Sequence, residues 1–385
     1  MSARRKEPSS SFQSKHKLNF DGWDVGRDGP LKLTYPATIG DGEMKIRETL
    51  LKAGVPLAPL PYDGDPLGLS FVLNTIDPET YTRTYSTTAF YLPNKERSNF
   101  SVLVSAHAHR VLTGKTEAGL ISALGVEFEY QGRPYYVNAR EDVILCAGSL
   151  RTPQILELSG IGRHEVLDRI GVPTKLDLPG LGQNVQEHMY LPLAFELKED
   201  VDWPTLDLLR DPALFAEHAE LHALGSGVFN SGMVSFTFLP LDMVAPPDRA
   251  AEIYAMGQDI LQRMIDTGAP PSWIEQTRIL VDRLKPGGTK RSPGCEIISY
   301  PGFLPGGQPN SPEPGKRYVS LLMALNHNFS RGTIHSASSD PAQEPEYDPN
   351  YFSEAIDLEV ALEIVKYIRR LTKIAPLRDM LGLSI

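Results

Sequence analysis

Short apolar runs with two different periods divide this 385-residue chain into strand-like and helix-like segments. Alternating apolar and polar positions are typical of a half-buried strand, whereas apolar residues three or four apart are typical of a helix packed on a core. The pattern predicts strands at 31–35, 125–130, 133–138, 296–300 and 318–326, and helices at 42–52, 250–267, 273–284 and 357–374. Gly54 ends the first helix, and Gln131-Gly132 joins two of the strands into a hairpin.

The segments between these elements are marked by composition. Residues 1–18 are polar, basic and rich in serine, which predicts a loose tail. Residues 55–68 are rich in proline, glycine and aspartate, which predicts a loop. Residues 203–285 have a mainly helical pattern, broken afterwards by dense proline and glycine.

One stretch combines a strand, a helix start and a helix stop. The apolar residues 142–147 predict a buried parallel strand. Thr152 can cap a helix of about two turns, with Pro153 at its first position and Gly160 or Gly162 ending it. The small residues Ala147, Gly148 and Ser149 would let a ligand approach the backbone, where free N–H groups favour an electron-rich or anionic group. We therefore expect a cofactor-facing turn here.

Residues 148–162 resemble the second signature of the glucose-methanol-choline (GMC) family of flavoprotein oxidoreductases. The constrained positions are matched by Gly148-Ser149, by Thr152-Pro153-Gln154-Ile155-Leu156 and by Ser159-Gly160-Ile161-Gly162. Residues 98–106 look like the family's strand before the adenine of FAD, and 180–188 are similar to a family stretch in which Glu187 replaces the usual Asp. Residues 330–351 look like the opening of the family's C-terminal segment. The resemblance begins near residue 28 and is weakest between 193 and 315.

The resemblance implies a mixed α+β and α/β fold, in which part of an FAD-binding domain is interleaved with a substrate domain built on an antiparallel sheet with helices. The expected parts are a partial FAD-binding domain at 19–190, a substrate-binding region at 191–325 and the truncated opening of the C-terminal segment at 326–385. The resemblance implies FAD as cofactor. Its expected contacts are Ala108 at the adenine, Ala147, Gly148, Ser149 and Thr152 at the flavin-proximal turn, and Asn184 in a neighbouring loop.

By the same resemblance, the reaction is oxidation of the CH–OH group of a small-molecule alcohol, with a wall of the substrate site at 229–232. A histidine would take the hydroxyl proton and the flavin a hydride. The identity of the alcohol, the choice between oxidase and dehydrogenase, and the oligomeric state stay open.

Two features of the family have no counterpart in the sequence. It contains no GxGxxG fingerprint for the pyrophosphate, and the family's catalytic histidine lies beyond the segment that ends here. We therefore expect the middle of a GMC protein with no recognisable catalytic residue, for which a complementing fragment is one expected partner. The alternative is a non-catalytic relic or interaction protein that keeps the scaffold without flavin.

Composition narrows the classes of protein and of partner that fit the sequence. With 41% hydrophobic and 22% charged residues the chain can bury a core, and its net charge of −10 disfavours nucleic acid as a partner. No apolar run is long enough to span a bilayer and no signal-peptide core is present, so the default location is cytoplasmic, although a missing N-terminus would leave it unknown. Cys146 is expected to be a buried, inert thiol.

Several other sequence patterns are similar to functional-site motifs. His218 and His222 are spaced for a metal on one helix face, but no third ligand follows, so a solvated face and no metal are expected. Gly114-Lys115-Thr116 echoes the end of a P-loop without its first glycine and predicts a turn. His327 and His335 are expected at the surface or in strand pairing, and His188 is expected to order its loop by hydrogen bonding.

Overall fold

The computed structural model describes residues 3–18, 26, 28–289, 291–306 and 311–382, and divides into two compact units. Unit 1 contains residues 1–97, 188–327 and 356–385, and unit 2 contains 98–187 and 328–355. The chain therefore passes from one unit to the other four times, which agrees with the interleaved fold expected from the sequence. The division differs from the expected domains in that residues 19–97 and about half of the C-terminal segment cluster in unit 1.

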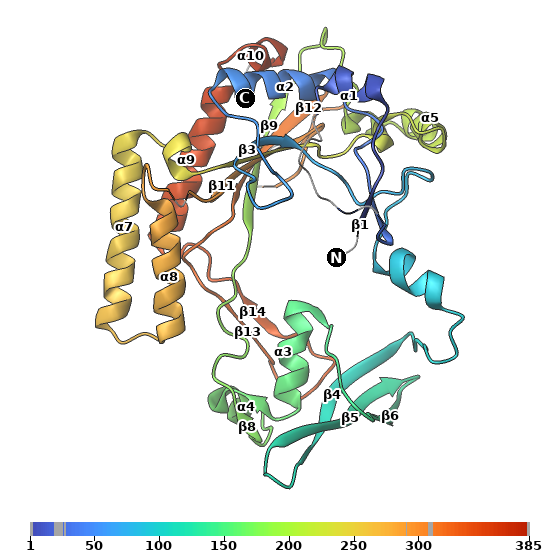
Figure 1. Ribbon diagram of the computed structural model, residues 1–385, viewed down its shortest axis with the longest axis vertical. Helices are drawn as coiled ribbons and strands as arrows, with labels where there is room; N and C mark the ends of the chain where they lie inside the picture. The colour runs from blue at the N-terminus through green and yellow to red at the C-terminus, as the bar shows by residue number, and fades with distance from the viewer. Residues whose placement is uncertain (1–2, 19–25, 27, 290, 307–310, 383–385) are drawn as a thin grey trace. The chain divides into compact units, whose positions relative to one another are not determined.

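Unit 1 is built on a five-stranded antiparallel sheet with the strand order β3-β10-β11-β12-β9 (Figure 1). The strands are β3 (Gly68–Phe71), β9 (Met189–Glu196), β10 (Ser235–Leu239), β11 (Cys295–Tyr300) and β12 (Tyr318–Leu325). All eight residues of β12 are buried, because this strand lies between β11 and β9 inside the sheet. Strand β10 lies within the segment whose pattern is mainly helical, so that prediction is wrong for residues 235–239.

Helices cover this sheet and extend beside it (Figure 1). They are α1 (Ser10–His16), α2 (Asp41–Lys52), α5 (Pro212–Ala223), α6 (Leu241–Val244), α7 (Pro247–Asp266), α8 (Pro271–Leu284), α9 (Ala355–Leu371) and α10 (Leu377–Met380). Ile46 and Leu50 of α2 line a small cavity with Ile297 and Leu321 of the sheet, which places the buried face of this helix on the strands. Gly42 lets α2 approach Trp203, since a Cβ there would lie 1.9 Å from the indole ring.

Much of the segment that the sequence predicts to be a loose tail forms regular secondary structure. Strand β1 (Ala3–Arg5) pairs in parallel with β2 (Leu31–Leu33). Ser9 caps α1 by accepting a hydrogen bond from the N–H of Phe12, at 3.3 Å. The prediction of a loose segment therefore fails where a serine supplies a helix cap and Phe12 finds an apolar cluster to pack on. Residues 1–2 lie outside the described part.

Unit 2 combines a three-stranded meander with helices and two strand pairs. Its elements are β4 (Ala106–Lys115), β5 (Ile121–Tyr130), β6 (Arg133–Asn138), α3 (Gly148–Leu158), β7 (Ile161–Gly162), α4 (His164–Arg169), β8 (Leu176–Asp177), β13 (Thr333–His335) and β14 (Glu346–Asp348). The predicted hairpin at Gln131-Gly132 is confirmed, and both residues have a positive φ, as a tight two-residue turn requires. A hairpin turn also follows β4, as predicted, but it begins only at Thr116, because Gly114 and Lys115 pair with β5 as the last residues of β4.

Four short helical segments complete the set: η1 (Thr87–Tyr91), η2 (Leu92–Asn94), η3 (Leu206–Arg210) and η4 (Val228–Asn230).

Two predicted strands of unit 2 are absent from the described structure. Neither 98–105 nor 142–147 forms a strand, and Ile144 is 82% exposed. A β-strand needs a hydrogen-bonded neighbour, and no described strand pairs with either segment. Cys146 is consequently exposed, so the prediction of a buried thiol is wrong. Cys295, in contrast, is buried, which raises the pKa of its thiol to about 12.

Candidate functional site

The N-terminal end of α3 is the expected cofactor-facing turn, and it is open to solvent. Ala147 is the residue before the helix, Gly148 and Ser149 begin it, and all three are exposed. Gly148 has φ +79°, and apart from its chain neighbours and the backbone of its own helix no described atom lies within 4 Å of the position that its Cβ would occupy. The first N–H groups of a helix have no partner within the helix, so this end offers free donors and space beside them.

The start of α3 differs from the sequence prediction. The helix begins at Gly148 and has 11 residues, so Thr152 is an internal, half-buried residue and Pro153 lies inside the helix. The cap prediction for Thr152 is therefore wrong. Starting the helix at Gly148 keeps Pro153 within its first two turns, where the missing N–H removes only one internal bond. The predicted stop is confirmed at Gly160, which has φ +85°.

The two other predicted cofactor residues of unit 2 lie on different elements. Ala108 is exposed on β4, opposite Phe128 and beside a break in the strand register. Asn184 lies in the loop after β8 with φ +61°, and its Oδ1 accepts a hydrogen bond of 2.9 Å from Nε of Arg331. Ala108, Asn184 and the α3 turn lie on three different segments of unit 2, and their shared role stays a prediction.

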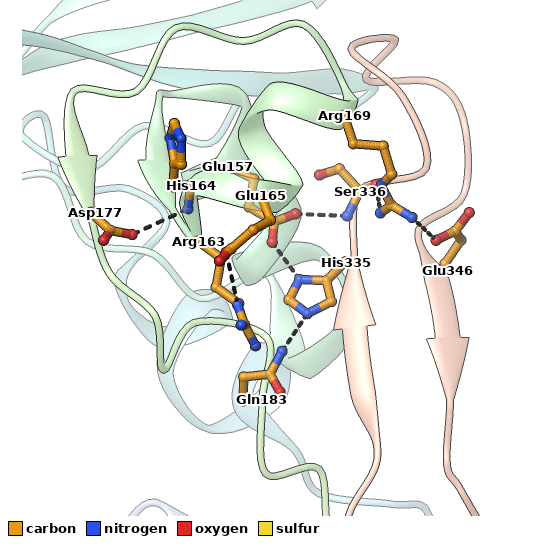
Figure 2. Close-up of polar contacts among 10 residues, drawn as sticks. All are labelled: Glu157, Arg163, His164, Glu165, Arg169, Asp177, Gln183, His335, Ser336 and Glu346. Carbon is orange, nitrogen blue, oxygen red and sulfur yellow. Dashed lines mark hydrogen bonds and ion pairs between the residues drawn. The ribbon is translucent and has the colours of Figure 1, made fainter. Parts of the chain in front are cut away.

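A buried carboxylate holds α3 to the C-terminal segment, as Figure 2 shows. Oε1 of Glu157 accepts a hydrogen bond of 2.6 Å from Nδ1 of His335, and Oε2 accepts one of 2.6 Å from the N–H of Ser336. On the other side of the imidazole, Nε2 of His335 lies 2.7 Å from Nε2 of Gln183. A neutral imidazole with its proton on Nδ1 satisfies all of these contacts, because its Nε2 then accepts from the amide.

The Glu157 contact has further links on both sides. Nε2 of Gln154, which is buried, donates to the carbonyl of Gln343 at 2.7 Å, and Arg151 contacts Glu344. Arg169 of α4 donates to the carbonyl of Ser336 at 3.0 Å and to Glu346 at 2.7 Å (Figure 2). These bonds connect parts of the sequence more than 160 positions apart. They fix the position of α3, and thereby of its exposed first turn, within unit 2.

The Glu157 network was not predicted from the sequence. His335 lies in β13 opposite Glu346, so the expected strand-pairing role is confirmed, but its side chain is only 11% exposed. The available signal was Glu157 itself, a charged residue among Ile155, Leu156 and Leu158 in an otherwise apolar stretch. Such a residue needs a partner when it is buried.

In unit 1, His188 contacts a second buried carboxylate. Its Nε2 lies 3.3 Å from Oε2 of Glu296, which is on β11 and is only 5% exposed. Burial raises the pKa of Glu296, and the neighbouring His188 opposes that shift. This contact, with a strand over 100 positions away, agrees with the expectation that His188 orders its loop by hydrogen bonding. Burial also lowers the pKa of His327, whose Nδ1 lies 3.5 Å from the hydroxyl of Ser292.

The paired histidines of α5 bind the backbone. Nδ1 of His218 accepts from the N–H of Val228 at 3.3 Å, and Nε2 of His222 donates to the carbonyl of Tyr81 at 3.2 Å. Both side chains are half-buried, so the predicted solvated face is wrong at these positions. Among the described residues there is no group of three or more potential metal-ligating side chains. Asn230, from the predicted substrate wall, is buried and bonds to the carbonyl of Ser226 at 2.7 Å, but its role stays a prediction.

Comparison with known proteins identifies the family to which the chain belongs. Two models described as GMC oxidoreductase match residues 51–190 and 328–382, together just over half of the chain. The chain belongs to the GMC oxidoreductase family. The GMC oxidoreductase family protein Mala s 12 of Malassezia sympodialis is 28% identical over 385 residues, covering 97% of this chain. The matched region spans only 56% of that relative's length.

Solved structures share the GMC fold of this chain. An FAD-dependent oxidoreductase from Chaetomium thermophilum has a TM-score of 0.84 and 23% identity, with 100% of this chain and 63% of that one covered. A fungal aryl-alcohol oxidase has a TM-score of 0.81, with the same identity and the same coverage. At this identity the likeness shows the fold alone. The cofactor indicated by the family is FAD, and α3 with its first turn lies within the first matched region.

No helix in the described ranges is both long and apolar enough to cross a bilayer.

Proposed function

We propose that this chain carries FAD contacts of a GMC enzyme that oxidises the CH–OH group of a small alcohol. The observation that supports the proposal most directly is the exposed first turn of α3, which lies in the family's signature and in the matched region. Support for an alcohol comes from the family and from the structural likeness to an aryl-alcohol oxidase.

The residues at this turn suit a cofactor that approaches the backbone closely. Gly148 leaves open the space that a side chain would fill, and its positive φ favours glycine. Ala147 and Ser149 are small and exposed, and the first N–H groups of α3 can donate to carbonyl or phosphate oxygens. We propose that these residues hold FAD, with Thr152 supporting the turn, and that Ala108 and Asn184 contribute at the adenine side and in the loop.

When bound, FAD would supply the acceptor for the hydride of the alcohol. The chain's own part would be to bind and orient this group, which lowers the barrier by holding the reacting atoms in place. The links from α3 to Gln343, Ser336 and Glu344 would keep the turn rigid, since they join it to the C-terminal segment of unit 2. We assign no proton acceptor among the described residues.

The proposal is tested by placing a side chain at Gly148. Gly148→Asn should weaken FAD binding at least tenfold, because the new side chain would occupy the space beside the free N–H groups. Gly119→Asn is a matched control: Gly119 has φ +77°, also has no atom within 4 Å of its Cβ position, and lies in the turn after β4. Asparagine tolerates a positive φ, so backbone strain should be similar and small in both variants.

FAD affinity would be measured by quenching of flavin fluorescence with the purified chain. Weaker binding in Gly148→Asn together with unchanged binding in Gly119→Asn would support the site. Equal affinity in both variants would reject the α3 turn as a contact. A folded chain with no saturable FAD binding would favour a scaffold without flavin.

A further inference from the structure

A cavity in unit 1, far along the chain from the α3 turn, contains an unusual buried cation. The cavity has a volume of about 90 Å³ and lies between the end of α1, α2, β3 and the loop before β3. Arg47 of α2 lines it and is only 8% exposed. A water molecule needs roughly 10–15 Å³ on the same scale, so the space suits a ligand of about six heavy atoms.

Arg47 has few partners for a buried guanidinium. Its Nη2 donates to the carbonyl of Lys17 at 3.2 Å, and its Cζ lies 5.7 Å from the ring centre of Phe71. Within the described residues no acid forms an ion pair with it, and burial lowers its pKa. Glu43, four positions earlier on α2, bonds instead to the hydroxyl of Ser299. A guanidinium carries five N–H donors, and burying its charge without an anion is costly.

The other walls of the cavity suggest what could supply that anion. Ser70 of β3 is 7% exposed, lines the cavity, and has a buried hydroxyl with no hydrogen-bond partner. The exposed Lys17 adds a second cation. Leu57, Leu69 and Phe71 are apolar, so they favour a hydrocarbon group over water. The chain as a whole has a net charge of −10, so attraction for an anion here is local.

We propose that the cavity beside Arg47 binds a small organic carboxylate. Its carboxylate pairs with the guanidinium of Arg47 and accepts a hydrogen bond from Ser70. Its short hydrocarbon part lies against Leu57, Leu69 and Phe71. A carboxylate matches the planar donors of arginine better than a neutral amide does, since both oxygens can accept charge-assisted hydrogen bonds. The proposal concerns unit 1 alone and does not depend on FAD.

The test compares three probes with the purified full chain at constant ionic strength. Sodium butyrate has the proposed charge and size, butyramide has the same shape without charge, and sodium phosphate has charge without a hydrocarbon part. Binding would be measured by calorimetry and by the shift in melting temperature, up to about 50 mM, which detects millimolar dissociation constants. We expect butyrate to bind at least tenfold more tightly than either of the other probes.

Variants decide whether Arg47 is responsible. Arg47→Met should abolish the preference for butyrate over butyramide, while Arg278→Met, at an exposed arginine paired with Glu275 on α8, should keep it. Ser70→Ala removes one hydroxyl and no charge, and should weaken butyrate at least threefold, so it tests the site even if Arg47→Met does not fold. The proposal is overturned if wild type binds no butyrate, if phosphate binds equally well, or if Arg47→Met and Ser70→Ala both bind butyrate like wild type.

Discussion

Two buried charged residues, one in each unit, differ in how completely their side chains are hydrogen-bonded. Glu157 of α3 is fully buried, and each of its oxygens accepts a hydrogen bond of 2.6 Å. Arg47 of α2 is nearly as buried, but it donates to one carbonyl at 3.2 Å and faces a cavity. A charge with complete partners holds elements together, whereas one with incomplete partners is able to receive a ligand. The contrast separates a structural role for Glu157 from a binding role for Arg47.

The largest effect is expected at Glu157. Glu157→Leu would leave the imidazole N–H of His335 and the backbone N–H of Ser336 buried without an acceptor. Leaving a buried donor without an acceptor costs about 1–3 kcal/mol of unfolding free energy for each of the two donors. Urea denaturation at neutral pH measures the loss, with Glu165→Leu at an exposed position of α4 as control. A loss as small as the control's would contradict the structural role of Glu157.

Glu43 is an intermediate case, because one of its oxygens bonds to Ser299 and the other has no partner in the described structure. Burial raises the pKa of Glu43 from 4.5 to about 7. The folded state therefore holds this proton more tightly than the unfolded state, and its contribution to stability is lost as pH rises from about 4.5 through 7.

Glu43→Gln should remove this pH dependence. Above pH 8 the variant should be more stable than wild type by up to about 3 kcal/mol, with a much smaller difference below pH 5. Denaturation across that range checks it, and Glu48→Gln, at an exposed position of the same helix, should show no such gain. A stability difference that does not change with pH would show that Glu43 is ionised throughout.

Arg47→Met should change stability far less than Glu157→Leu. The variant loses one hydrogen bond and the contact with Phe71, but it also removes a buried, unpaired charge. We expect a change within about 1 kcal/mol without ligand, measured by the same urea denaturation. A loss of more than about 3 kcal/mol of unfolding free energy would show that Arg47, like Glu157, has complete partners, and would contradict the difference between the two residues.

The smallest effect is expected at Arg169, which contacts Ser336 beside the hydrogen bonds of Glu157. Arg169→Ala removes an ion pair with Glu346 in which both side chains are about half exposed, and one bond to the carbonyl of Ser336. The loss should be under about 1 kcal/mol and should shrink as salt is added, because exposed pairs are screened. Thermal melts at low and high salt would reveal a larger, salt-independent loss if the pair were more important.

The sequence predicted most elements whose signals are local. The hairpin at Gln131-Gly132, the helix end at Gly160 and the long helices α7 and α8 all follow from turn residues or from apolar spacing within one element. These features depend on neighbours a few positions away, so a single sequence carries the information. The family resemblance then supplied the fold and the cofactor, which periodicity alone did not.

Features that depend on distant partners could not be predicted in this way. Residues 142–147 have the composition of a buried strand, but pairing decides whether a strand forms, and none is formed here. The contact between Glu157 and His335 joins positions 178 apart, and the incomplete partners of Arg47 become visible only when β3 and α1 are placed around it. For both charged residues, burial and partners had to come from the structure.

The functional proposal depends on whether the α3 turn takes up flavin. The most direct measurement is the visible absorption spectrum of the purified chain after incubation with FAD and removal of free cofactor by gel filtration. We expect flavin bands that elute with the protein and are diminished in Gly148→Asn. A colourless, folded protein would contradict it.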